Sequence, residues 1–342
     1  MQFNKLIDTL ADGCSLTAEE TEGFMQALMR GEMDAVQAGA LLIALRAKGE
    51  TVEELTAAAR TMLDFAVLLD INAKNLVDTC GTGGDGANTF NISTGAALVA
   101  AAAGAVVAKH GNRSVSSHCG SADSLELAGV NIDLPPLAVR ACIEKVGIGF
   151  LFAPNFHLAM RHVVGIRKSL GVRTLFNLLG PLTNPARAPF RVIGVFDDKW
   201  LEPMARAAVS LDVKRVMVVH SEDGLDEISP AAATNVVEIT NGKPRSYMLT
   251  PEDFGYNRID LSAIKSTSPQ HSLEMLKTAL AGDTPASQAI AMNAAAALYV
   301  AQRASDIKEG AEMAMLAMRA GHALDKLEAL IETSQAEAQQ DA

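Results

Sequence analysis

The glycine-rich segment 81–86 constrains the fold of this chain more than any other feature. It reads GTGGDG, follows a short apolar run at 76–77 and precedes an apolar stretch at 93–103. A second apolar run, 105–108, ends on Lys109. This order predicts a strand, a glycine loop, a helix and a second strand, which together form one βαβ unit. The unit places the glycine loop and a cationic loop at neighbouring strand ends.

The glycine loop has the composition of an anion-binding site. Glycine tolerates positive φ and lets the backbone approach a ligand closely. Free N–H groups at a helix N-terminus attract negative charge, as does the helix dipole. Asn91, Ser93 and Thr94 would add side-chain donors at the start of the helix, and Lys109 would add a positive charge across the crevice. We therefore expect the crevice to bind phosphate.

Two common nucleotide motifs fit this segment poorly. The segment matches G-x-G-x-x-G, but a dinucleotide site needs an acidic residue about 20 residues further on to hold a ribose hydroxyl. Lys109 occupies that place. A cation suits a phosphate better than a ribose, which disfavours NAD. The Walker pattern G-x-x-x-x-G-K-[ST] is absent, which disfavours a P-loop ATPase.

Composition excludes several other classes of protein. The chain has 342 residues, 49% of them hydrophobic, which suffices for one or two domains. Its formal net charge of −11 argues against a general nucleic-acid or anionic-membrane surface. Its 4 cysteines show no C-x-x-C spacing, which favours a reduced, cytoplasmic protein over a zinc module or disulfide scaffold. Neither a secretory leader nor a membrane-spanning run is evident.

The pattern of elements predicts a helical N-terminal region followed by an α/β region. Residues 1–70 contain two capping boxes, Thr17-x-x-Glu20 and Thr51-x-x-Glu54, and a further N-cap candidate, Asp34. From residue 76 strands and helices alternate. The expected strands are 76–79, 105–109, 148–152, 191–196 and 214–220, with a hairpin around Asn241-Gly242. Two helices separated by Gly171 are expected over 155–180. Residues 268–335 read as helical, with Ser268 and Ser287 as possible caps.

Two further clusters can be interpreted either as ligand-binding sites or as solvated surface. Arg161, His162, Arg167, Lys168 and Arg173 form a basic cluster, which is either a solvated helix face or an anion site. Asp226 and Glu227 follow a very apolar strand in the loop HSEDGLDEIS. They are either part of a solvated acidic loop or ligands for Mg²⁺, a hard cation that prefers carboxylate and phosphate oxygens.

Taken together, the motifs resemble those of the anthranilate phosphoribosyltransferase family, which is related to the pyrimidine nucleoside phosphorylases. The resemblance rests on GTGGDG…NIST, KHGNRSVSS…GSAD, FLFAP (150–154), GIRKSLGVRTLFNLLGPLTNPA (165–186) and VVHSEDGLDEIS (218–229). With the helical N-terminal region, it covers nearly the whole chain, and the motifs occur in the expected order.

The resemblance implies an α/β fold class with a small all-helical domain. That domain would span 1–70, with a returning helical segment at about 165–188. A larger α/β domain, with a central and mostly parallel sheet flanked by helices, would span 74–164 and 189–342. The family relationship also implies a homodimer formed through the N-terminal helical domain.

The implied reaction transfers phosphoribose from 5-phosphoribosyl 1-diphosphate to the amine of anthranilate, a step of tryptophan biosynthesis. Two Mg²⁺ ions per subunit are expected, with Ser93, Asp226 and Glu227 as metal ligands. Lys109 is expected to act electrostatically, and no acid or base is assigned. The residues implied for anthranilate are Gly81, His110, Asn112, Arg167, Gly180 and Pro181. Those implied for the sugar diphosphate are Gly81, Gly84, Asp85, Thr89, Asn91, Ile92, Ser93, Thr94, Lys109, His110, Gly111, Asn112, Arg113, Ser114, Val115, Ser116, Ser117 and Ser121.

The chain departs from the family pattern at His118, where a lysine or another basic residue is common. Two alternatives remain open at the level of sequence. A pyrimidine nucleoside phosphorylase would share the architecture, but the KHGN and LDE motifs favour the transferase. A non-catalytic nucleic-acid-binding paralogue would need a basic surface stripe, which the negative net charge of the chain disfavours.

Overall fold

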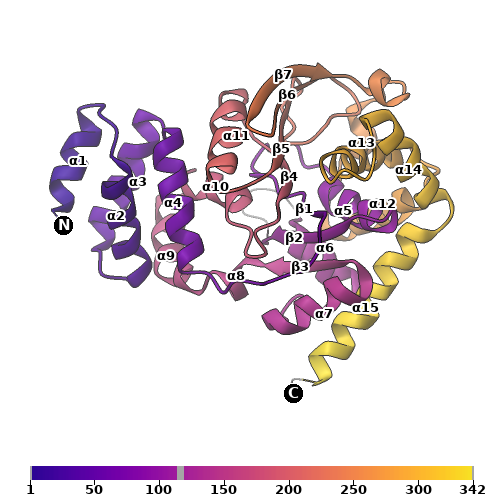
Figure 1. The fold of residues 1–342 in the computed structure, drawn as a ribbon, viewed down its shortest axis with the longest axis horizontal. Coiled ribbons are helices and arrows are strands. Elements are labelled where there is room, and N and C mark those ends of the chain that lie inside the picture. Colours follow the sequence, from indigo (N-terminus) through magenta and orange to yellow (C-terminus); the bar gives the residue numbers. More distant parts are fainter. Residues whose placement is uncertain (1, 114–118, 341–342) are drawn as a thin grey trace.

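A computed structural model describes residues 2–113 and 119–340 of the chain (Figure 1). A bundle of helices lies at one end of the molecule and a sheet covered by helices forms the rest. This arrangement confirms the predicted fold class.

Four helices build the N-terminal bundle: α1 (Phe3–Ala11), α2 (Ala18–Arg30), α3 (Ala35–Lys48) and α4 (Val52–Asp64). Both predicted capping boxes are present. The Thr17 and Thr51 hydroxyls accept from the backbone N–H groups of Glu20 and Glu54, and each glutamate accepts from the threonine N–H in return. The Asp34 carboxylate caps α3 as expected. Each cap satisfies backbone donors that would otherwise lack a partner.

The sheet has seven strands in the order β3-β2-β1-β4-β5-β6-β7. Neighbours are parallel from β3 to β5, and β6 and β7 continue the sheet as an antiparallel hairpin. Asn241 and Gly242 both have positive φ, as the predicted two-residue turn requires. The strands are β1 (Leu76–Asp78), β2 (Val106–Gly111), β3 (Ile148–Phe152), β4 (Phe190–Gly194), β5 (Arg215–Ser221), β6 (Thr234–Thr240) and β7 (Lys243–Leu249).

Two apolar clusters form the core, one on each face of the sheet. Along β5, Met217 and Val219 belong to the cluster that includes α5 and α13, whereas Val216 and Val218 face α11 and the N-terminal bundle. The helices of this region are α5 (Ile92–Ala102), α6 (Ser121–Ala128), α7 (Pro136–Val146), α11 (Leu201–Ser210), α12 (Pro269–Leu280), α13 (Pro285–Val300), α14 (Ile307–Arg319) and α15 (His322–Gln340).

The segment after β3 returns to the N-terminal bundle. It forms α8 (Ala153–Phe156), α9 (Arg161–Leu170) and α10 (Phe176–Leu179), and Gly171 ends α9 with φ 62°. Val163 and Leu179 pack in the same cluster as α2 and α4. Single 3₁₀ turns lie at Leu158–Met160, Gly180–Leu182, Asp198–Trp200, Pro251–Phe254 and Leu261–Ile264.

The capping prediction was right for Ser268 and wrong for Ser287. The Ser268 side chain accepts from His271 N–H at the start of α12. Thr284 is the N-cap of α13, and Ser287 lies three residues inside the helix. Its hydroxyl accepts from Thr284 N–H and donates to the Ala279 carbonyl, so it completes the cap from within.

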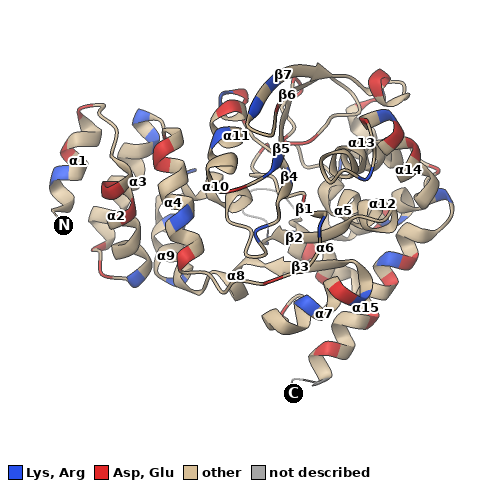
Figure 2. Ribbon diagram, viewed as in Figure 1, with Lys and Arg blue, Asp and Glu red and all other residues tan. Residues whose placement is uncertain are grey.

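Acidic and basic residues are interspersed along the helices, with no described segment of the ribbon dominated by one charge (Figure 2). None of the described helices is long and apolar enough to span a membrane.

Candidate functional site

A cavity of about 1050 Å³ lies between the helical bundle and the carboxyl ends of the parallel strands. Strand ends at such an edge are where α/β proteins place their sites. The predicted residues that line it are Gly81, Gly84, Asp85, Thr89, Asn91, Ser93, Lys109, His110, Gly111, Asn112, Arg113, Ser121, Arg167, Gly180, Pro181, Asp226 and Glu227. Ser114, Val115, Ser116, Ser117 and His118 lie outside the described residues.

The glycine loop links β1 to α5 and carries free backbone donors. Gly83, Gly84 and Gly86 have φ of 63°, 82° and 73°, which is why glycine is needed there. The N–H groups of Gly84, Asp85 and Gly86 find no protein acceptor within the part of the chain that the structure describes. These three free donors lie beside the N-terminus of α5, where the sequence predicts an anion site.

Lys109 lies at the floor of the cavity, where it is 3% exposed. Its Nζ is 3.3 Å from the Thr79 carbonyl oxygen and 3.4 Å from Ser93 Oγ. The ammonium group therefore lies between the end of β1 and the first turn of α5. From there its charge faces the loop that would hold a diphosphate.

Not every predicted donor at the helix start is free. The Asn91 side-chain amide donates to the carbonyls of Cys119 and Gly120, and the Thr94 hydroxyl donates to Asn91 Oδ1. Asn91 thus holds Cys119 and Gly120, the two residues directly before α6. Thr94 and Ile92 are buried and do not line the cavity. Of the predicted side-chain donors at the helix start, Ser93 is the one that reaches Lys109.

Three carboxylates meet beside the glycine loop. Asp226 Oδ2 accepts from Gly83 N–H at 2.7 Å, and Glu227 Oε1 accepts from Ser93 N–H at 2.9 Å. Burial and the nearby Asp85 carboxylate raise the pKa of Asp226 to about 7. Burial and Asp226 raise the pKa of Glu227 well above its ordinary value. Both shifts have the same main causes, which are burial and the negative charge of a neighbouring carboxylate.

Two glycines let the acidic loop approach the sheet. A Cβ on Gly194, at the end of β4, would lie 1.5 Å from the Asp226 carbonyl oxygen. A Cβ on Gly81 would lie 2.8 Å from Asp226 Oδ2. Asp226 is therefore held against the glycine loop by contacts that no side chain at these positions would permit.

The donor set fits Mg²⁺. Asp226 and Glu227 supply carboxylate oxygens and Ser93 supplies a hydroxyl, all hard ligands. No three acidic, histidine or cysteine side chains within the described residues form a metal cage of their own. Mg²⁺ commonly binds through one or two carboxylates and completes its shell with phosphate and water. The arrangement therefore suits an ion that arrives with a diphosphate.

Arg167 lies on the opposite wall, on α9. Its guanidinium is 5.6 Å from the centre of the Phe176 ring. Burial lowers its pKa below the ordinary value, and none of the described carboxylates pairs with it. A half-buried guanidinium beside an aromatic ring suits a flat anion such as an aromatic carboxylate.

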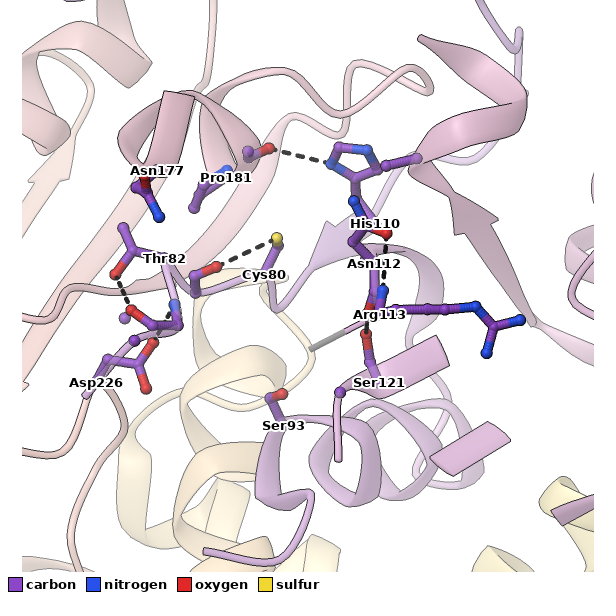
Figure 3. A pocket seen from close by; sticks show the side chains of 18 of the residues that line it. Cys80, Thr82, Ser93, His110, Asn112, Arg113, Ser121, Asn177, Pro181 and Asp226 are labelled. Carbon is purple, nitrogen blue, oxygen red and sulfur yellow. Dashed lines mark hydrogen bonds between the residues drawn. The ribbon is translucent and has the colours of Figure 1, made fainter. Parts of the chain in front are cut away.

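His110 and His157 form a second part of this wall. The His110 Nδ1 is 3.1 Å from the Gly180 carbonyl oxygen, and its Nε2 has no partner within residues 2–113 and 119–340 (Figure 3). The two rings lie 5.2 Å apart, and neither nitrogen of His157 has a hydrogen-bond partner among the described residues. Burial lowers the pKa of His110 to about 4 and that of His157 to about 3. Both rings are neutral at pH 7 and offer polar atoms to a ligand.

His157 and Arg173 are site residues that the sequence did not single out. His157 follows the strand motif FLFAP, which gave no sign that its ring would meet His110. Arg173 was predicted only as one member of the basic cluster. Its guanidinium contacts the Phe196 ring at 4.2 Å and donates to the Gly84 carbonyl, so it joins the returning segment to the glycine loop.

Asn112 and Arg113 differ in where their side chains point. Asn112 lines the cavity, and its backbone carbonyl accepts from Ser121 Oγ. The Arg113 guanidinium points away from the centre of the cavity, toward Asp123 and Glu126 (Figure 3). It also lies 5.6 Å from the Phe152 ring. In this conformation the charge of Arg113 is directed at the carboxylates of α6.

Two family models match the chain. The helical bundle domain of a glycosyl transferase family matches residues 4–66, and the α/β domain of the same family matches residues 73–324.

Known proteins resemble the chain over nearly its whole length. An anthranilate phosphoribosyltransferase from Thioalkalivibrio sulfidiphilus is 53% identical over 97% of this chain and 98% of its own. The crystal structure of an anthranilate phosphoribosyltransferase from Thermus thermophilus is 45% identical, with a TM-score of 0.91 over 96% of this chain and 99% of that one. The Saccharomyces cerevisiae enzyme, solved in complex with PRPP and Mg, is 29% identical, with a TM-score of 0.90 over 98% of both chains.

Proposed function

Because the chain belongs to the anthranilate phosphoribosyltransferase family, we propose that it transfers phosphoribose from 5-phosphoribosyl 1-diphosphate to anthranilate. The products are N-(5-phosphoribosyl)anthranilate and pyrophosphate, in a step of tryptophan biosynthesis. One observation carries the proposal. A single cavity joins free loop amides, Lys109 and two carboxylates on one side to an unpaired arginine and two neutral histidines on the other.

The donor side is suited to the leaving pyrophosphate. As the bond to ribose C1 breaks, negative charge grows on the diphosphate, and preorganised donors stabilise it most strongly in a site that excludes water. The amides of Gly84 and Asp85 and the ammonium of Lys109 supply such donors. When bound beside Ser93, Asp226 and Glu227, Mg²⁺ would neutralise further diphosphate charge. We propose two ions per subunit.

The acceptor side is suited to anthranilate. The guanidinium of Arg167 would hold the carboxylate, and Asn112 would donate to it or accept from the amine. An aromatic amine is uncharged at neutral pH and has its lone pair free, so it needs no strong base. His110 and His157 are neutral, and they line the cavity beside Gly180 and Pro181 with ring nitrogens that can form hydrogen bonds. The rate would then come from holding amine and C1 in line.

Anthranilate is fluorescent, so its consumption can be followed as a loss of fluorescence. This gives the proposal a direct test. The purified protein is mixed with anthranilate, 5-phosphoribosyl 1-diphosphate and Mg²⁺. We expect the fluorescence to fall, and to stay constant when EDTA removes the metal or when the sugar diphosphate is omitted. Constant fluorescence in the complete mixture would refute the proposed function.

We also propose a homodimer formed through the helical bundle. The outer face of α3 presents Val36, Ala40, Ile43 and Ala47 at helical spacing. Val36 is 79% exposed and Ile43 is 37% exposed. An apolar stripe of this kind on an otherwise charged bundle is typical of a subunit interface. We place the protein in the cytoplasm, a location that its free cysteines support.

A further inference from the structure

Arg191 is a buried charge to which the proposed chemistry gives no role. It belongs to β4, is 2% exposed, and is the register partner of Asp78 at the end of β1. It does not line the cavity formed by the described residues. Burial is costly for a guanidinium unless its N–H groups and its charge are satisfied. The groups that satisfy Arg191 therefore show what it holds in place.

The guanidinium fixes both ends of one irregular segment. Its Nη1 donates to the Pro181 carbonyl oxygen at 2.9 Å, and its Nε donates to the Ala188 carbonyl oxygen at 3.1 Å. Residues 181–188 carry the chain from α10 to β4. Proline has no N–H group, so at positions 181 and 185 the segment lacks the usual backbone donors.

Asp78 holds the middle of the same segment from the opposite side. Its Oδ2 accepts from Asn184 Nδ2 at 2.7 Å, and its Oδ1 accepts from His110 N–H at 3.1 Å. The His110 ring in turn contacts the Gly180 carbonyl. The buried pair thus connects the segment to β1, β2 and β4, and the segment begins at the acceptor wall of the cavity.

We propose that Arg191 is a positioning residue for the acceptor subsite, because it fixes the Gly180-Pro181 wall without touching either substrate. This inference rests on the proposed function. An arginine suits the role because its planar fork presents two donors in fixed directions, so it can hold two carbonyls seven residues apart. A lysine would keep the charge beside Asp78 but would act as a single flexible donor.

The test is Arg191→Lys, with both Michaelis constants measured by anthranilate fluorescence. A displaced wall should raise the apparent anthranilate constant by about 10-fold, since small shifts of a positioned substrate are costly. The constant for the sugar diphosphate should change by less than about twofold, because the glycine loop and Lys109 keep their own contacts. A merely structural role would instead lower the active fraction, and with it kcat, while leaving both constants unchanged.

The matched control is Arg215→Lys, a change in a strand arginine at the far end of β5. Arg215 pairs with Glu238 at 2.7 Å and stacks on Tyr299, away from the cavity. This variant should lose stability without changing either constant. If Arg191→Lys fails to fold, Asn184→Ala can replace it, because it removes the hydrogen bond between the segment and Asp78. It should raise the anthranilate constant and leave the constant for the sugar diphosphate nearly unchanged.

The outcomes separate the two proposals. If the wild-type protein consumes no anthranilate, the proposed function is wrong. If the wild type is active and the folded variant keeps its anthranilate constant, or both constants rise equally, the positioning role of Arg191 is overturned.

Discussion

At the scale of single residues, the site places two cationic side chains, Lys109 and Arg167, in different environments. Lys109 is buried among oxygen atoms at the floor, whereas Arg167 lies on the far wall without a carboxylate partner. The first arrangement suits an anion held close to the glycine loop. The position of Arg167 leaves its guanidinium available to bind a second anion. The two cations should therefore act on different substrates, and the following substitutions separate them.

Lys109→Met keeps most of the side-chain volume and removes the charge. We expect turnover to fall by about 100-fold or more, because one preorganised donor to developing negative charge is typically worth that much. Steady-state kinetics at saturating substrates measure the effect, with circular dichroism to confirm folding. Wild-type turnover in a folded variant would refute the electrostatic role. The exposed Lys199→Met, beside Trp200, is the control.

Arg167→Ala tests the acceptor clamp. We expect the apparent constant for anthranilate to rise by about 10- to 100-fold, the loss expected for a charge-assisted hydrogen bond. The constant for the sugar diphosphate should change much less. Equal increases in both constants would contradict the assignment. Arg206→Ala, on the exposed face of α11, removes an arginine that pairs with Glu202 and serves as the control.

His157→Phe tests the buried neutral ring through pH. The pKa of His157 falls from about 6.5 in the unfolded chain to about 3 on folding, so the unfolded state binds the extra proton between these values. Lowering the pH from 8 to 5 should therefore destabilise the wild type, relative to the variant, by about 2 kcal/mol.

Urea denaturation at pH 8 and pH 5 measures this difference directly. Packing changes caused by the substitution cancel because they act equally at both pH values. A difference between variant and wild type that does not change with pH would show that His157 is not buried in its neutral form. The exposed His322→Phe is the control.

At the scale of elements, the site depends on how closely three loops approach one another. The end of β4, the glycine loop after β1 and the acidic loop after β5 meet where Gly194 and Gly81 leave room for Asp226. The Thr82 N–H donates to the Gly194 carbonyl at 2.8 Å, and the Phe196 N–H donates to Thr82 Oγ1. These contacts fix the glycine loop to β4. The donor half of the site is therefore built by the packing of strand ends.

Gly194→Ala should break this packing. The new Cβ overlaps the Asp226 backbone, which cannot rotate away, so the acidic loop must move. We expect a loss of about 1–3 kcal/mol in unfolding free energy, as for overpacked cores, together with loss of activity. Thermal unfolding and the fluorescence assay measure the two effects.

The matched control is Gly165→Ala in the middle of α9, where no atom lies within 4 Å of the added Cβ. Alanine there should stabilise the helix by about 0.5–1 kcal/mol. Equal stability of both variants would show that the Asp226 loop does not require the space at Gly194.

At the scale of the whole molecule, the bundle and the sheet share one core while the cavity lies between them. The apolar cluster of α2 and α4 continues through α11 to one face of β4, β5 and β6. The bundle side contributes Arg167, whereas the strand ends contribute both Lys109 and His110. The outer stripe of α3 is the part of the bundle that faces away from this core.

A double change, Val36→Glu with Ile43→Glu, tests the proposed dimer. Both side chains are exposed, so the free subunit should tolerate them, while two buried negative charges should prevent association. Light scattering after size-exclusion chromatography should give twice the mass of one chain for the wild type and the mass of one chain for the variant. A monomeric wild type, or a variant that remains dimeric, would contradict this interface.

The sequence by itself determined the elements and the donor half of the site. Capping boxes, the Asn-Gly turn and the alternation of strands and helices are set by local preferences, and the structure confirms them. Glycines at 83, 84 and 86 and the lysine ending β2 predict an anion site, because a βαβ unit brings consecutive strand ends together. The residues left two interpretations open for Arg167 and for the acidic pair, and the family resemblance favoured the functional one.

Only the tertiary structure decided which side chains are already engaged and which remain free. Asn91 looks like a phosphate donor in the sequence, yet its amide bonds to the Cys119 carbonyl, which folding brings to it from 28 residues away. His157 meets His110, and Arg191 meets Pro181, across distances in the chain that no local pattern encodes. Local preference fixes where helices and strands form, whereas hydrogen-bond partners and pKa values depend on burial, which exists only after the two cores have packed.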